Sequence, residues 1–153
     1  MADISTTPLF TLSLKVGSLD DMGKTPFGQR RLAAVAGGTF EGPKLKGKVV
    51  ENGGSDWLLV RPDGATQLDV RIVLKTDDDH LIGMTYRGIR HGDPAVMARV
   101  NRGEPVDPSS YYFRIVPFFE TASDKYGWLN RIVAVGLGHR EPQGPIYRVF
   151  EVL

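Results

Sequence analysis

Apolar and polar residues alternate along most of this chain. The pattern is clearest in "TQLDVRIVLKT" (66–76), where Leu68, Val70, Ile72 and Leu74 share one face and the residues between them share the other. Similar runs recur down to the C-terminus, separated by turns rich in Gly and Pro. The pattern predicts about nine strands in an all-β fold, and the short connections favour antiparallel pairing.

Two segments depart from this alternation. "DPAVMARVNRGEP" predicts one short helix near 93–102, because Asp93 can cap its start, Pro94 suits the first helical position and Gly103 can end it. "SDKYGWLNR" predicts a loop or a helical turn. We expect a disordered N-terminus over residues 1–8 and a single domain over 9–153, since no linker or repeat divides the chain.

Many strands in one small domain must either stack as a sandwich or close on themselves. Closure removes exposed strand edges, and glycines inside strands allow tight coiling. The Gly37–Gly38 pair in "RRLAAVAGGTFEG" predicts a bulge or a sharp bend. We therefore favour a single antiparallel β-barrel of about 8–10 strands over a sandwich. Such a barrel can hold a small ligand in its mouth.

Composition excludes several classes of partner and chemistry. The 19 basic and 18 acidic residues leave a net charge of +1, which gives no electrostatic argument for nucleic acid or an anionic membrane as a partner, and we expect neither. The absence of cysteine excludes disulfides and thiolate chemistry. The start of the chain lacks the pattern of a signal peptide, and no stretch is apolar enough to span a membrane. We therefore expect a cytoplasmic protein.

Motifs for metals, nucleotides and nucleophilic serine are missing. His80, His91 and His139 do not form a metal-binding pair, and the acidic run at 77–79 lacks the spacing of a calcium loop. There is no GxSxG, no GxGxxG and no P-loop. The sequence predicts neither a metal nor another cofactor.

Asp56 and Trp57 follow the double-glycine turn in "NGGSDW". The Asp56 carboxylate can cap this turn, which is the interpretation we favour. At a barrel mouth beside an indole, it can instead act as a general base with a raised pKa.

Charged residues inside apolar strands are the other candidates for chemistry. Asp69 and Arg71 share a face, which either meets solvent, as we favour, or lines a cavity. Arg114 in "YYFRIVPFF" has apolar residues on both faces of its strand, so we expect a buried ion-pair partner or a cavity residue. Tyr86 in "MTYRG" carries the same ambiguity.

The segment "GWLN" offers two further candidates. Trp128 is either a plug of the barrel, as we favour, or a platform for a ligand, and Asn130 either orients a substrate carbonyl or satisfies a loop backbone. The residues expected to bind substrate are Trp57, Tyr86, Phe119, Trp128 and Asn130.

The segments "GGTFEGPKLKGKV", "GGSDW", "LDVRIVLKTDD", "YYFRIVPFFET" and "WLN" occur together in one order. In this order and spacing the chain resembles the family called domain of unknown function 3237, from Leu9 nearly to the C-terminus. The resemblance implies a compact antiparallel β-barrel, loosely similar to calycin-like and allene-oxide-cyclase-like barrels, with an interior cavity and no recognised cofactor. The chain departs from the family pattern at Asp79, where Gly is expected, and at Val73, where Tyr is common.

These patterns lead to three hypotheses of function. In the first, the barrel is a cofactor-independent isomerase, cyclase, hydratase or hydrolase that acts on a small apolar or aromatic carbonyl compound. Asp56 or Asp69 moves a proton, while Arg71 or Arg114 stabilises the oxyanion. In the second, the cavity carries an apolar ligand without reaction, and in the third the core is filled and the domain is structural. Apolar outer strands would also allow a homodimer.

Overall fold

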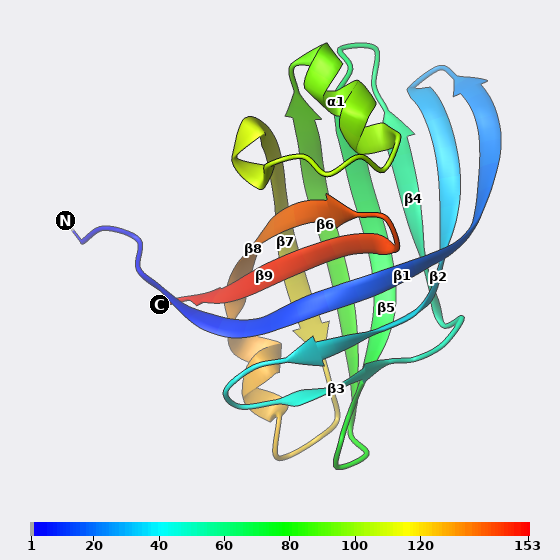
Figure 1. The fold of residues 1–153 in the computed structure, drawn as a ribbon. Helices are drawn as coiled ribbons and strands as arrows, with labels where there is room; N and C mark the ends of the chain where they lie inside the picture. Colours follow the sequence, from blue (N-terminus) through cyan, green and yellow to red (C-terminus); the bar gives the residue numbers. More distant parts are fainter. Residues whose placement is uncertain (1) are drawn as a thin grey trace.

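The computed structural model describes residues 2–153 and consists mainly of antiparallel strands (Figure 1). The strands are β1 (Thr6–Thr25), β2 (Gly28–Glu41), β3 (Lys46–Val49), β4 (Gly54–Val60), β5 (Thr66–Thr76), β6 (Leu81–Gly92), β7 (Tyr111–Glu120), β8 (Val133–Glu141) and β9 (Gly144–Val152). The helical segments are α1 (Pro94–Asn101) and the 3-10 turns η1 (Pro108–Ser110) and η2 (Gly127–Arg131).

The strands close into a ring, so the predicted antiparallel barrel is confirmed. Each strand from β5 to β9 pairs with the next, and β9 pairs back with β1. β1 pairs with β2. β3 and β4 each pair with both β2 and β5, so β3 and β4 together occupy one position in the ring, between β2 and β5. Closure leaves the main sheet without a free edge along these pairings.

The predicted bend at Gly37–Gly38 is present in β2. The pairing of β1 with β2 shifts between Lys15 and Val16, opposite this glycine pair. Gly38 has a φ of 152°, and a Cβ there would lie 2.2 Å from the Ser13 carbonyl oxygen. Only glycine fits this close approach of two strands, which explains why the bend lies here.

Local turn chemistry follows the sequence in two further places. The Asp93 carboxylate accepts a hydrogen bond of 2.9 Å from the Ala95 N–H at the start of α1, which confirms the predicted helix and its cap. Asp79, which replaces the glycine expected in the β5–β6 turn, has a φ of 69°. Asp is among the few residues that tolerate this left-handed conformation.

β1 begins at Thr6, within the segment expected to be disordered.

The barrel has one end beside β3 and η2 and an opposite end beside α1 (Figure 1). The end next to β3 and η2, which we call the filled end, is packed with apolar side chains. Phe10 makes edge-to-face contacts with Phe40 at 5.7 Å and with Phe119 at 5.9 Å between ring centroids. The opposite end, which we call the cavity end, lies beside α1, where Met97 faces the interior.

Candidate functional site

The cavity end contains a pocket of about 400 Å³, large enough for a small organic ligand. Most of its lining residues are apolar, and they come from several strands of the ring and from Met97 of α1. A smaller group of its lining residues can ionise or form strong hydrogen bonds. The ionisable ones are Arg31, Asp56, Tyr86, Arg90, Arg140 and Tyr147, and the polar side chains of Thr66 and Asn101 also line the pocket.

Asp56 reaches the cavity because of strand alternation. On β4, Asp56, Leu58 and Val60 line the cavity, whereas Trp57 lies on the outer face and is 48% exposed. The two residues that the sequence presents as a pair therefore lie on opposite sides of the barrel wall.

The Asp56 carboxylate also fills a gap in the barrel wall. The pairing of β4 with β5 passes from Asp56–Val70 to Leu59–Gln67, and Trp57 has no partner on β5 between them. The Asp69 N–H instead donates a hydrogen bond of 3.1 Å to Asp56 Oδ1. The carboxylate thus satisfies a backbone donor of the neighbouring strand, and it does not cap the preceding turn.

Burial dominates the ionisation of Asp56. It raises the pKa of this carboxyl to about 6 from an ordinary value of 3.8. The hydrogen bond from the Asp69 N–H and the positive charge of Arg90 favour the carboxylate and oppose this rise. A carboxyl with such a pKa exchanges protons near neutral pH.

Arg90 is the positively charged group within electrostatic reach of Asp56. Burial, which disfavours the charged form, lowers the pKa of its guanidinium, and repulsion by Arg140 acts in the same direction. The guanidinium carbon lies 5.4 Å from the centre of the Phe113 ring, a cation–π arrangement. Among residues 2–153, no carboxylate forms a salt bridge with Arg90.

Two tyrosines complete the polar part of the cavity. The rings of Tyr86 and Tyr147 meet edge to face at 5.3 Å. Burial raises the pKa of both phenols above the ordinary value, and the nearby Asp56 charge adds to this effect. Both hydroxyls therefore stay protonated at neutral pH and can donate hydrogen bonds.

Buried polar atoms without a partner gather in this cavity. Within the described part of the chain they are Arg31 Nε, Arg90 Nε and the Tyr147 hydroxyl, and all three residues line the pocket. Arg31 is compensated in part, because its Nε lies 3.6 Å from Asp21 Oδ2. Buried polar groups without partners are rare in native proteins and call for an explanation such as a ligand.

The structure divides the residues predicted from the sequence into three places. Asp56 and Tyr86 line the cavity. Trp57, Asp69, Arg71 and Arg114 lie on the outer face of the barrel. Phe119, Trp128 and Asn130 belong to the filled end or to the loop beside it.

The outer position of the charged residues follows from the alternation of their strands. Thr66, Leu68 and Val70 are buried on β5, so Asp69 and Arg71 take the other face. The expectation that Arg114 is a buried ion-pair partner or a cavity residue is wrong, because Arg114 is exposed on β7. Since these side chains meet solvent, they do not converge on the interior cavity.

Three of the four outer residues line a separate groove on the barrel surface. Trp57, Asp69 and Arg114 share it with Tyr112, and the Arg114 guanidinium lies 4.8 Å from the centre of the Tyr112 ring. Asp69 Oδ2 lies 3.6 Å from Arg87 Nη2 in an exposed ion pair. Val73, where the family pattern favours Tyr, has the same parity on β5 as Asp69 and so does not line the cavity.

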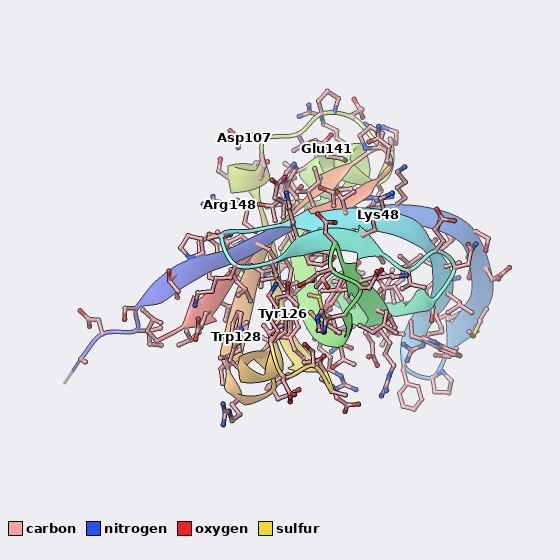
Figure 2. All side chains as sticks on the ribbon, turned by 90° about the horizontal axis from the view of Figure 1, so that it is seen from below. Lys48, Asp107, Tyr126, Trp128, Glu141 and Arg148 are labelled. Atoms are coloured by element: carbon pink, nitrogen blue, oxygen red, sulfur yellow. The ribbon has the colours of Figure 1, made fainter. Side chains whose placement is uncertain are left out.

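The remaining predicted residues stabilise the filled end. Phe119 packs against Phe10 in the core. Figure 2 shows Trp128 near Tyr126 beside η2, and Lys44 Nζ lies 4.8 Å from the centre of the Trp128 ring. The Asn130 side chain accepts from the Thr121 N–H at 2.8 Å and donates to the Thr121 carbonyl at 2.9 Å, so it satisfies a loop backbone.

Sequence reasoning missed Arg90, Arg140 and Tyr147. One signal was present, since Arg90 lies four residues after Tyr86 on β6 and therefore shares its face. Arg140 has the same parity on β8 as buried Gly138, and Tyr147 the same parity on β9 as buried Val149. Parity alone could not reveal that these faces meet at one cavity.

The described residues also lack two features. Over residues 2–153, no three His, Cys, Asp or Glu side chains gather into a group that could hold a metal ion. No helix in this range is long and apolar enough to span a membrane.

Known proteins resemble this chain over its whole length. A UPF0311 protein from Rhodopseudomonas palustris is 32% identical over 150 residues, which cover 98% of this chain and 97% of that protein. A crystal structure of a conserved R. palustris protein of unknown function has a TM-score of 0.95 at 31% identity and covers 100% of both chains. A beta-barrel like protein from Acinetobacter baumannii has a TM-score of 0.87 at 38% identity and covers 100% of this chain and 98% of its own.

A more distant structure shares the fold alone. It is that of an enzyme from Penicillium herquei, with 20% identity and a TM-score of 0.76 over 100% of this chain and 97% of the other. The family model described as "Protein of unknown function (DUF3237)" matches residues 4–152. The chain therefore belongs to this family, as its resemblance in sequence predicts.

Proposed function

We propose that this protein is a cofactor-independent enzyme in which Asp56 transfers a proton to or from a small apolar or aromatic carbonyl compound. The observation that carries the proposal is the position of Asp56, whose partly buried carboxyl faces a cavity of about 400 Å³ together with Arg90 and Tyr147. A perturbed carboxyl and a cation that converge on open space are typical of acid–base catalysis.

The ionisation of Asp56 suits a catalyst at neutral pH. A general base works best when its pKa is close to the working pH, because it is then ionised and still holds a proton firmly. With a pKa of about 6, Asp56 meets this condition, whereas a carboxyl at 3.8 would be a much weaker base. Burial in the cavity is the physical cause of the difference.

Arg90 and Tyr147 supply the complementary group. When Asp56 removes a proton from the carbon beside a carbonyl, the electron pair moves to the carbonyl oxygen and forms an enolate. The Arg90 guanidinium and the Tyr147 hydroxyl can donate hydrogen bonds to that oxygen, since each has a buried donor without a partner. Protonated Asp56 then returns the proton to the same carbon or to another one.

This proton transfer is common to the isomerase, cyclase, hydratase and hydrolase reactions that the sequence leaves open. In a hydratase or a hydrolase, Asp56 would take the proton from water in place of carbon. The enzyme of this fold from P. herquei supports the view that the barrel is compatible with catalysis.

A carrier barrel is the alternative. A carrier needs an apolar pocket in which ionisable groups are paired, because unpaired charges would weaken the binding of an apolar ligand. Arg90 has no salt-bridge partner within residues 2–153, and the Tyr147 hydroxyl has no hydrogen bond there. These unpaired donors favour the enzyme.

The proposal is tested by titration of Asp56 and by exchange of carbon-bound protons. Carbon-13 NMR of the aspartate carboxyls, assigned with Asp56→Asn, should show one group with a pKa of about 6. In D₂O, the protein should accelerate deuterium incorporation beside the carbonyl of 2-tetralone, and Asp56→Asn should slow it about 100-fold or more.

Asp69→Asn is the matched control, because it makes the same chemical change on the outer face of the neighbouring strand. It should retain exchange. An Asp56 pKa near the ordinary value of 3.8, or exchange that survives in Asp56→Asn, would contradict the proposal.

A further inference from the structure

The charges that line the cavity do not balance. Its lining contains Arg31, Arg90 and Arg140 but a single carboxylate, Asp56. Arg31 has Asp21 beside it. Arg90 and Arg140 are left with one carboxylate between them, and that carboxylate carries no charge when it is protonated. At least one positive charge of this pair is therefore left without a carboxylate partner, so the cavity favours a ligand that brings a negative charge.

Arg140 is the arginine without any assigned role. It lies near the end of β8 and lines the cavity from the far side of the ring, since β8 and β4 are not neighbours. Its backbone is fixed, because its N–H donates to the Tyr111 hydroxyl at 2.8 Å. The next residue, Glu141, contacts His139 Nε2 at 3.0 Å and does not form a salt bridge with Arg140.

Arg140 and Arg90 lie close enough to repel each other. Both residues line the cavity, and the charge of Arg140 lowers the pKa of Arg90. Two like charges that face a common space attract an anion when neither of them takes part in a salt bridge. A carboxylate matches the planar donor arrangement of a guanidinium and can accept two hydrogen bonds from it.

We propose that the substrate is an acid whose carboxylate binds Arg140, while its apolar body lies along the cavity wall toward Asp56. The inference deepens the proposed function and rests on the cavity being the active site. It divides the work of the two arginines, since Arg140 holds the permanent charge of the substrate and Arg90 meets the oxyanion that forms during reaction.

The shape of the wall narrows the substrate class further. Val16, Val35, Leu58, Val70 and Phe113 line the same cavity as Asp56 and Arg140. In a volume of about 400 Å³, an aromatic or alicyclic carbon skeleton of one or two rings would fill the apolar part. The expected substrate is therefore an aromatic or alicyclic keto acid.

Matched acids and amides test this inference without any need for turnover. Calorimetric titration at pH 7.5 would compare benzoate, cinnamate and 2-naphthoate with the corresponding amides, which have nearly the same shape but no charge. At least one acid should bind the wild-type protein about tenfold or more tightly than its amide, as one well-placed charged contact provides. Arg140→Gln should reduce this ratio to near one, and Arg140→Lys should retain part of it.

Arg148→Gln is the matched control, because Arg148 lies on the neighbouring strand β9 and is exposed (Figure 2). It should keep the wild-type preference. Asp56→Asn should also keep the preference for acids, so loss of catalysis and loss of acid binding can be told apart. Absence of binding by all three acids at millimolar concentration, or a preference unchanged in Arg140→Gln, would overturn the inference.

Discussion

The two ends of the barrel interior have the same strand geometry and opposite contents. On β6, the inward residues Ile82 and Met84 are fully buried at the filled end, whereas Arg90 faces the pocket at the cavity end. β2 shows the same change, from Phe40 at the filled end to Arg31 at the rim of the cavity. In β6 and in β2, one part of the strand thus packs in the core and another part lines the candidate site.

This comparison shows where the stability of the fold resides. Edge-to-face aromatic pairs close the filled end, and these phenylalanine rings have no polar atoms that require a hydrogen-bond partner. The cavity end keeps donors without partners and a carboxyl whose ionisation is unfavourable. We expect substitutions at the filled end to cost stability and some substitutions at the cavity end to increase it.

The largest effect should come from Phe40→Ala at the filled end. Phe40 is 1% exposed and packs against Phe10, so its truncation leaves a cavity in the core. We expect a loss of about 3–5 kcal/mol in the free energy of unfolding, measured by urea denaturation. Trp57→Ala on the outer face should cost about 1 kcal/mol or less. Similar losses in the two variants would remove the distinction between the core and the outer face.

Asp56→Asn should stabilise the protein at alkaline pH. The folded-state pKa of Asp56 is raised from 3.8 to about 6, so its favourable contribution is complete below the unfolded value and is lost as pH rises through about 6. At about 1.4 kcal/mol for each pKa unit, the variant should gain about 2–3 kcal/mol over the wild type at pH 8 and almost nothing at pH 4. Urea denaturation across this pH range measures the difference.

The control for this prediction is Asp69→Asn. Its carboxylate lies on the outer face, so the pH dependence of stability should stay close to that of the wild type. If Asp56→Asn were no more stable than the wild type at pH 8, the ionisation of Asp56 would not be costly in the folded protein.

Tyr147→Phe should have a smaller effect than Asp56→Asn, and it should raise stability while it lowers activity. The Tyr147 hydroxyl is buried and forms no hydrogen bond of ordinary geometry, although the Tyr86 hydroxyl is near enough to shift its pKa, so its removal should raise the free energy of unfolding by about 1 kcal/mol or less. Exchange of 2-tetralone protons should slow about tenfold, because one donor to the enolate is lost. Tyr112→Phe, on the outer face, is the control and should change neither quantity. A marked loss of stability in Tyr147→Phe would mean that the hydroxyl makes a stabilising bond.

Arg87→Gln should have the smallest effect. The ion pair between Arg87 and Asp69 spans 3.6 Å, and the Arg87 side chain is 85% exposed, so solvent screens the attraction. We expect a change of about 0.5 kcal/mol or less in the free energy of unfolding and unaltered binding of 2-naphthoate. A change in binding would indicate that the outer groove communicates with the cavity.

Much of the fold could be predicted because its determinants are local. The alternation in β5, the capped start of α1 at Asp93 and the bend at Gly38 each depend on a few neighbouring residues. The candidate site was predicted only at Asp56 and Tyr86. Alternation along β5 predicts that Asp69 and Arg71 share a face, but it does not say which face of the strand turns inward. In the structure, the face with these two charged residues turns outward.

By itself, the sequence predicted the strands and the turns, favoured a closed antiparallel barrel over a sandwich, and indicated the family. These depend on backbone propensity, on the period of apolar residues and on motifs that follow one another in a fixed order along the chain. Only the tertiary structure decided that Asp56, Arg90, Arg140 and Tyr147 share one cavity. They come from four different strands, and the closure of the ring sets which inward faces meet and how much space remains between them. The pKa of Asp56 follows from that enclosure, because removal of a carboxylate from water depends on everything that surrounds it.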